Sequence, residues 1–217
     1  MIKENMNKTQ TRIPSKKGVL KFLPLGGCGE VTRSCYVYEY EDDIVIVDMG
    51  LQFPEDDMPG IDYIIPNVDY LRPKKRNIRG IIITHGHYDH IGAIPHLLEP
   101  LGNPSIYATA LTRGIVLKRQ EEFTHSPKPK IFIINHESKI KLGKFDIEFF
   151  HVNHNIPDSI GVLLKTPAGN VVHTGDWKFD HEPVNEKPAD IGRLKQIGKD
   201  GVLLLVSDSP DAEIPGR

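Results

Sequence analysis

The segment 84–90 carries the residues best suited to chemistry, and it reads Thr-His-Gly-His-Tyr-Asp-His. Three imidazoles and a carboxylate crowded together are costly unless a cation neutralises and orients them. Histidine nitrogens and aspartate oxygens are ligands of zinc-like metals. His85 and His87 lie one residue apart and can point into one site, while Asp89 and His90 can serve a second. The segment therefore predicts a site for two metal ions.

Two further donors follow strand-like runs later in the chain. His154 begins a turn after one such run, and Asp176 closes another. A carboxylate at this place can bridge two cations, which lie roughly 3.5–4 Å apart in two-metal sites. We therefore expect His154 and Asp176 to complete the ligand set.

The alternation of side chains along a strand decides between neighbouring candidates. Period-two alternation places His151 on the opposite face from His154, and His173 on the opposite face from Asp176. We therefore expect His151 to be a solvated surface residue, and Asp176 rather than His173 to face the metals.

Asp48 ends the apolar run 43–47 and allows two interpretations. A charged residue at the end of a buried strand often orients a ligand histidine from behind. It can equally be a turn residue that accepts hydrogen bonds from backbone N–H groups. The sequence leaves both open.

The elements that must position these residues are mostly strands. Short apolar or alternating runs predict strands at 19–25, 34–40, 43–47, 78–84, 105–108, 130–134, 145–152, 160–166, 171–174 and 202–206. The second and third form a hairpin. Helices are expected at 91–98, with His96 beside its apolar face, at 109–123 and at 189–197. This pattern favours a layered α/β or α+β sandwich.

The composition is that of an ordinary soluble globular protein. The chain has 217 residues and a formal net charge of −2, so charge gives no hint of a nucleic-acid partner. Cys28 and Cys35 lack metal or redox spacing and are typical of reduced thiols in the cytoplasm. No apolar run is long enough to cross a membrane. Residues 1–17 are polar and lysine-rich, and we expect a disordered arm.

The ligand pattern resembles a known superfamily. His85-x-His87-x-Asp89-His90, followed by His154 and Asp176, is similar to the metallo-β-lactamase signature. Four segments narrow the resemblance to the ribonuclease J family: 50–60, 84–92, 152–159 and 173–180. The string Gly-Asp-Trp-Lys-Phe-Asp at 175–180 is the most discriminating of them. The resemblance covers nearly everything from about Gly18 onward.

The resemblance implies an αββα sandwich and a nuclease of the β-CASP group. Such an enzyme cuts RNA phosphodiesters as a 5′→3′ exonuclease and as an endonuclease, with two divalent ions, zinc or manganese, that make hydroxide available near neutral pH. The full-length form is expected to be cytoplasmic, without a membrane, and to pair with itself or a family paralogue. The implied ligands are His85, His87 and His154 for one ion, Asp89 and His90 for the other, and Asp176 as the bridge. Asp89 and Asp176 are then the candidate catalytic carboxylates.

The sequence departs from the family at several positions. Tyr88 stands where the family often has Glu, Trp177 where it often has Phe, and Pro210 where it often has Thr. By the same resemblance, residues 18–207 are the first segment of the metallo-β-lactamase domain, and 208–217 begin the β-CASP insertion. The sandwich is then incomplete at the C-terminus, and the second metal site lacks one histidine.

Two alternative functions stay open. The chain can be a non-nuclease hydrolase of a small ester or lactone, or a catalytically incomplete metal-binding fragment or subunit. The basic segments 72–79 and 128–130 can contact RNA phosphates, although solvated loops are the commoner outcome for such clusters.

Overall fold

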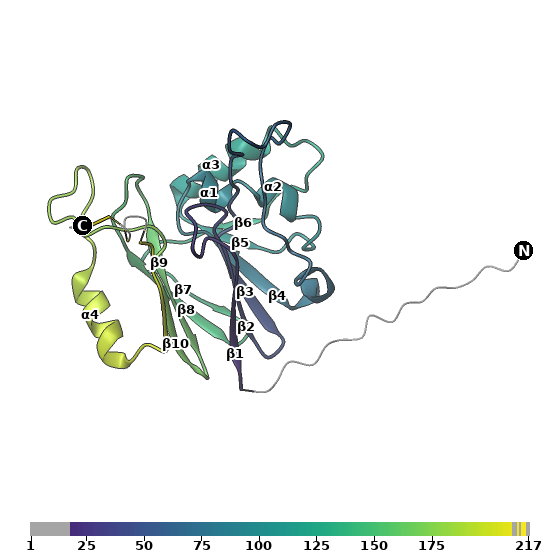
Figure 1. The fold of residues 1–217 in the computed structure, drawn as a ribbon. Coiled ribbons are helices and arrows are strands. Elements are labelled where there is room, and N and C mark those ends of the chain that lie inside the picture. The colour runs from purple at the N-terminus through teal and green to yellow at the C-terminus, as the bar shows by residue number, and fades with distance from the viewer. Residues whose placement is uncertain (1–17, 210–211, 213, 216–217) are drawn as a thin grey trace, which may run out of the picture.

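Two β-sheets form the centre of the computed structural model, which describes residues 18–209, 212 and 214–215 (Figure 1). The expected N-terminal arm and part of the segment 208–217 lie outside these residues. The first sheet, in spatial order, contains β1 (Leu20–Gly26), β2 (Cys35–Tyr40), β3 (Asp43–Val47), β4 (Ile78–Ile82), β5 (Ile106–Ala108) and β6 (Ile131–Ile133). The second, in spatial order, contains β11 (Leu204–Val206), β10 (Gly169–His173), β9 (Ile160–Thr166), β8 (Phe145–His151) and β7 (Lys139–Leu142).

The pairing of the strands explains where polar residues gather. Strands β1 to β3 are antiparallel, as the predicted hairpin requires, whereas β3 to β6 run parallel. The second sheet is antiparallel except for the parallel pair β10–β11. Since parallel strands place their carboxyl ends at one edge, the loops after β3 and β4 lie next to each other.

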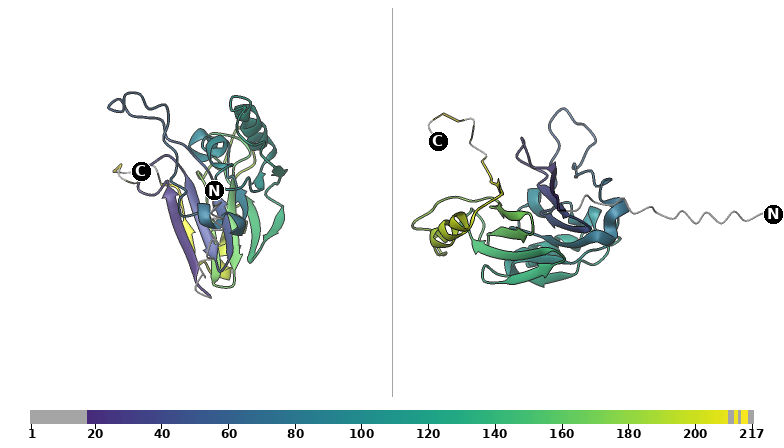
Figure 2. Two further views of the ribbon diagram at one scale, coloured as in Figure 1. Left: turned by 90° about the vertical axis from the view of Figure 1, so that its right-hand side faces the viewer. Right: turned by 90° about the horizontal axis from the view of Figure 1, so that it is seen from below.

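Helices cover the outer face of each sheet. They are the 3₁₀ helix η1 (Arg72–Asn77), α1 (Tyr88–Ile91), α2 (Ile94–Leu97), α3 (Ala110–Gln120) and α4 (Ile191–Asp200). Helices α1, α2 and α3 lie over the first sheet and α4 over the second, with the two sheets between them (Figures 1 and 2). The arrangement is the helix–sheet–sheet–helix sandwich that the resemblance predicts.

Strand β2 shows why the sheets stack in this way. Its alternate residues Cys35 and Val37 belong to the core under α1 and α2, while Tyr36 and Tyr38 belong to the core between the sheets. Both faces of the strand are therefore buried. A third, smaller core joins Ile197 of α4 to the outer face of the second sheet.

Two local expectations were wrong. The helix predicted over 91–98 is divided into α1 and α2, because the amide of Ala93 donates to the carbonyl of Met49 at 2.9 Å and the new helix begins with Pro95 in its first turn. Strand β7 was missed, because the alternation of two lysines with Ile140 and Leu142 extends over only four residues.

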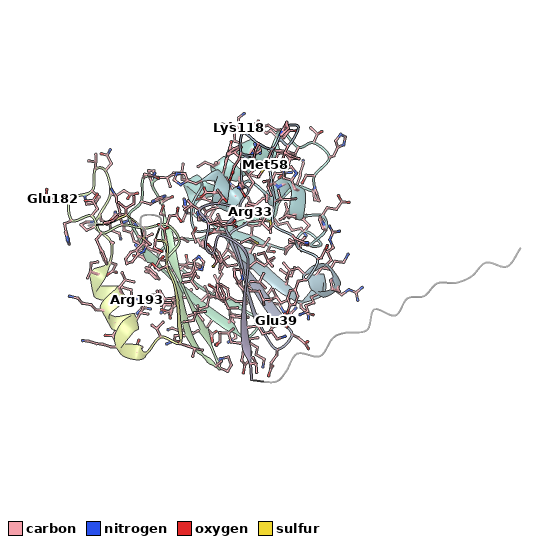
Figure 3. The ribbon with its side chains drawn as sticks, viewed as in Figure 1. Arg33, Glu39, Met58, Lys118, Glu182 and Arg193 are labelled. Atoms are coloured by element: carbon pink, nitrogen blue, oxygen red, sulfur yellow. The ribbon has the colours of Figure 1, made fainter. Side chains whose placement is uncertain are left out.

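The basic segment around η1 forms ion pairs with acidic residues of neighbouring segments. One of its partners, Glu39, lies at the lower end of β2 in Figure 3, and Arg33 lies near the upper end. Lys74 lies 2.8 Å from the buried carboxylate of Glu39, Arg72 lies 3.0 Å from Asp69, and Arg79 pairs with Asp43. These contacts favour a structural role for the segment over contact with phosphates. Within the described residues, no helix is both long and apolar enough to span a membrane.

Candidate metal centre

The six metal ligands predicted from the sequence lie together at one edge of the sandwich. They come from the segments that follow β4, β8 and β10, and Asp89 and His90 lie in α1. The side chains that offer ligand atoms within 4.8 Å of one another form two groups, which are His85, His87, His154 and Asp176 in one, and Asp89, His90 and Asp176 in the other.

The first group is dominated by imidazole nitrogens that face each other. Nε2 of His85 lies 3.0 Å from Nδ1 of His87, and Nε2 of His154 lies 3.3 Å from the same atom. Oδ2 of Asp176 lies 3.6 Å from Nε2 of His154 and 3.9 Å from that of His85. Three nitrogens and one carboxylate oxygen that converge so closely suit a single divalent cation.

The second group shares Asp176 with the first. Oδ1 of Asp176 lies 3.2 Å from Nε2 of His90, and Oδ2 of Asp89 lies 3.5 Å from the same nitrogen. The two oxygens of Asp176 therefore face different groups: Oδ2 faces His85 and His154, and Oδ1 faces His90.

Asp48 lies behind both groups and is completely buried. Its carboxylate accepts hydrogen bonds from Nδ1 of His90 at 2.8 Å and from the backbone N–H and hydroxyl of Thr84, both at 2.8 Å. The same Thr84 hydroxyl lies 3.0 Å from Nδ1 of His85. Because that hydroxyl donates to Asp48, it accepts from His85. Both imidazoles thus present Nε2 to the centre.

The backbone of Asp48 is also unusual, with φ at +61°. This left-handed conformation is uncommon for a residue other than glycine. The amide of Asp48 donates to the carbonyl of Ile82 at 2.8 Å, which fixes the turn at the end of β3. Of the two interpretations that the sequence left open, the carboxylate contacts favour the orientation of ligand histidines.

The buried imidazoles differ in charge. Burial lowers the pKa of His85 far below its usual value, and the neighbouring histidines add to the shift, so its nitrogen lone pair is free for a cation. Burial acts in the same direction on His90, but the charge of Asp48 and hydrogen bonds to Asp176, Asp48 and Asp89 raise its pKa well above the usual value. His90 is therefore protonated in the absence of a metal, and a cation that binds at this nitrogen would replace the proton.

The carboxylates are held ionised. Burial alone would raise the pKa of Asp176, but its hydrogen bond to His90 and the charge of that imidazole lower it. The pKa of Asp89 is lowered for the same reasons. Ionised carboxylates and imidazoles are the donor set of divalent metals once a cation has displaced the proton of His90, so the residues of this centre fit metal ions.

The prediction that His151 is a solvated surface residue was wrong. The side chain is 8% exposed, and its Nε2 lies 2.9 Å from the carbonyl of Lys187. The segment 178–190 folds back over the end of β8, and alternation along the strand carries no information about this distant segment. His173 belongs to neither donor group, and its Nδ1 lies 2.8 Å from the hydroxyl of Tyr38 between the sheets.

Asn153 connects the His154 turn to this same segment. Its side chain accepts from the amide of Ala189 at 2.7 Å and donates to the carbonyl of Lys187 at 2.9 Å. Its own carbonyl accepts from the amide of Lys178 at 2.8 Å. The chain that follows Asp176 is thus fastened directly beside His154.

Sequence reasoning missed Asp208, which follows β11 and lines a cavity of about 510 Å³ together with Asp89, His90 and Asp176. Burial and the negative charge of Asp176 raise the pKa of Asp208 to about 6. The signal that could have identified Asp208 is its place after the end of β11, which runs parallel to β10.

A family model for the metallo-β-lactamase superfamily matches residues 28–212. The chain belongs to the metallo-β-lactamase superfamily. A solved structure of a protein of unknown function from Enterococcus faecalis superposes on this chain with a TM-score of 0.67. That likeness covers 91% of this chain and 52% of the other, at 17% sequence identity.

Within the superfamily, the chain is similar to ribonuclease J. It is 41% identical over 205 residues to ribonuclease J 1 of Streptococcus pyogenes, which covers 94% of this chain and 36% of that protein. It is also 41% identical over 203 residues to ribonuclease J of Thermus thermophilus, covering 91% of this chain and 35% of that protein. The chain thus spans about a third of the length of these relatives.

Proposed function

We propose that this chain is the metal-binding part of a ribonuclease J-like enzyme that hydrolyses RNA phosphodiesters. The observation that carries the proposal is the placement of Asp176, whose two oxygens face the two donor groups of the centre. The similarity to ribonuclease J supports RNA as the substrate. In this proposal, residues 18–207 form the first segment of the domain and 208–217 begin an insertion.

The roles of the residues follow from the two donor groups. His85, His87 and His154 hold one ion, Asp89 and His90 hold the second, and Asp176 bridges them. Divalent ions at such a site supply Lewis acidity and an activated water molecule near neutral pH. Zinc is the preferred metal because of the three imidazoles, and manganese is the alternative.

Asp48 acts through other residues, as a positioning residue. It fixes the tautomers of His85 and His90, so that each Nε2 is directed at the centre. Asp89 and Asp176 provide negative charge, which lets the site retain cations near the phosphate of the substrate. RNA is the proposed partner, and a homo-oligomer or a paralogue pair is the proposed state of the longer, cytoplasmic protein.

The test is cleavage of a 5′-labelled single-stranded RNA by the chain loaded with zinc or with manganese. Product lengths separate 5′→3′ exonuclease from endonuclease activity. His87→Ala is the inactive control, and exposed His125→Ala is the matched control for loss of a histidine. Turnover of a small ester or lactone without RNA cleavage would overturn the proposal. Two bound metals without any hydrolysis would identify a metal-binding subunit instead.

A further inference from the structure

Two exposed aromatic rings lie beside the candidate metal centre. Tyr88 stands between His87 and Asp89 in the chain, and its ring is 6.5 Å from that of Phe53, with the planes inclined at 42°. Phe53 is 60% exposed and Tyr88 is 39% exposed. A contact that served only to pack the segment 52–64 against α1 would bury more of both rings.

Cationic side chains accompany these rings. The guanidinium of Arg119 lies 4.6 Å from the centre of the Tyr88 ring, a cation–π distance. Arg119 also pairs with Glu122 at 3.0 Å, and Lys118 pairs with Glu121 at 2.7 Å, so both cations have a carboxylate partner on the same helix. Lys118, one residue earlier on α3, lies at the upper end of the molecule, where Met58 of the segment 52–64 also lies (Figure 3).

A hollow opens next to Tyr88. Its volume is about 400 Å³, and its walls include Leu111, Gly114, Lys118 and Arg119 of α3. This is within the usual range for small-ligand sites. Ile115, which also lines the hollow, lies so close to Gly86 that a Cβ there would be 2.6 Å from its Cδ1. The hollow therefore adjoins the loop that carries the candidate ligands.

We propose that Phe53 and Tyr88 form a stacking platform for one base of single-stranded RNA, a proposal that rests on the proposed function. Exposed aromatic rings flanked by Lys and Arg are the chemistry that recognises unpaired nucleotides, because every base has a π-face and every nucleotide carries a phosphate. A base in a duplex is stacked on its neighbours and does not reach such a platform.

Residue 88 is a tyrosine, whose ring can stack and carries no charge that would repel an approaching polyanion. The platform then holds the base of a nucleotide close to the phosphodiester at the metal centre, and it selects for strands in which that base is present.

The test measures the affinity of the metal-loaded chain for a cleavage-resistant phosphorothioate oligoribonucleotide. A series of strands, each lacking the base at one position, is compared with the intact strand. The wild-type chain is expected to bind one of these abasic strands roughly tenfold more weakly than the intact one. Tyr88→Leu and Phe53→Leu are expected to bind the intact strand roughly tenfold more weakly and to lose this positional effect.

Two controls make the result specific. Tyr88→Phe keeps the ring and is expected to retain the positional effect. Phe132→Leu removes a ring that is 54% exposed on β6, outside the proposed platform, and is expected to behave as the wild type. If Tyr88→Leu does not fold, the wild-type abasic series and Phe53→Leu still test whether the stacking platform exists.

The outcomes separate the platform from the proposed function. The platform alone is overturned if the chain binds and cleaves RNA but binds all the abasic strands equally well. It is also overturned if Phe53→Leu and Tyr88→Leu still bind one abasic strand more weakly, as the wild type does. Absence of RNA binding by the metal-loaded chain overturns the proposed function of this chain and the platform with it.

Discussion

Nδ1 of His90 lies 2.8 Å from the carboxylate of Asp48, and both side chains are buried. The two residues are 42 positions apart in the chain. The contact places a fixed negative charge behind an imidazole whose other nitrogen faces Asp176. Asp48 therefore orients the candidate centre without itself belonging to either ligand group.

Replacement of Asp48 by Asn is expected to weaken metal binding by roughly 10–100-fold, the usual effect when the partner of a ligand histidine is lost. The amide cannot balance the charge on His90 or accept all the hydrogen bonds from Thr84. Titration calorimetry with zinc measures the change. Asp43→Asn is the control, because Asp43 is a largely buried carboxylate at the other end of the same strand. Equal losses in the two variants would contradict an orienting role.

Removal of the proposed bridge should affect both ions together. The wild-type chain is expected to hold about two metals, and Asp176→Ala about one or none, since a carboxylate that spans a two-metal site serves both cations. Elemental mass spectrometry of the purified chains gives the metal content. Asp180→Asn, a change of a half-buried carboxylate that lies shortly after Asp176 and belongs to neither donor group, should leave it unchanged. Two metals in Asp176→Ala would refute the bridging role.

Glu39 predicts a dependence of stability on pH. Burial raises the pKa of this carboxyl, but hydrogen bonds from Lys21, Lys74 and Tyr70 outweigh it and leave the pKa below the ordinary value of 4.5. A depressed pKa in the folded state gives stability that is present above pH 4.5 and is lost as the pH falls through the folded pKa.

Glu39→Gln should therefore lower the free energy of unfolding by about 1–3 kcal/mol at pH 7, because buried donors lose a charged acceptor. The difference from the wild type should shrink as the pH falls below 4.5, because Glu39 takes up a proton first in the unfolded chain and then, at its lower folded pKa, in the native protein. Urea unfolding of both chains at pH 7 and at pH 4 measures it. A difference that does not change with pH would mean that packing, and not charge, explains the loss.

Asn153→Ala is expected to release the segment 178–190 from the His154 turn. The buried amide of Ala189 would lose its acceptor, which costs about 1–3 kcal/mol. Hydrogen exchange should become faster in this segment, and zinc affinity should fall as His154 loses its support. Asn170→Ala provides the comparison, because Asn170 bonds the carbonyl of Gly201 in a more exposed place. Unchanged exchange in 178–190 would show that Asn153 does not fasten it.

The sequence by itself determined the candidate ligands and the type of fold. The ligands of the segment 84–90 follow one buried strand directly, so their closeness is local and is visible in the spacing. The alternation on β2 likewise predicted a strand, since its three tyrosines fall at every second position and therefore on one face.

Only the tertiary structure decided what lies behind and beside those ligands. The role of Asp48 depends on Thr84, which is 36 residues away, and the burial of His151 depends on Lys187, also 36 residues away. The contact between Phe53 and Tyr88 likewise joins a loop to α1. Such contacts form when distant strands align in the sheets, and side-chain periodicity records only which face of its own strand or helix a residue occupies.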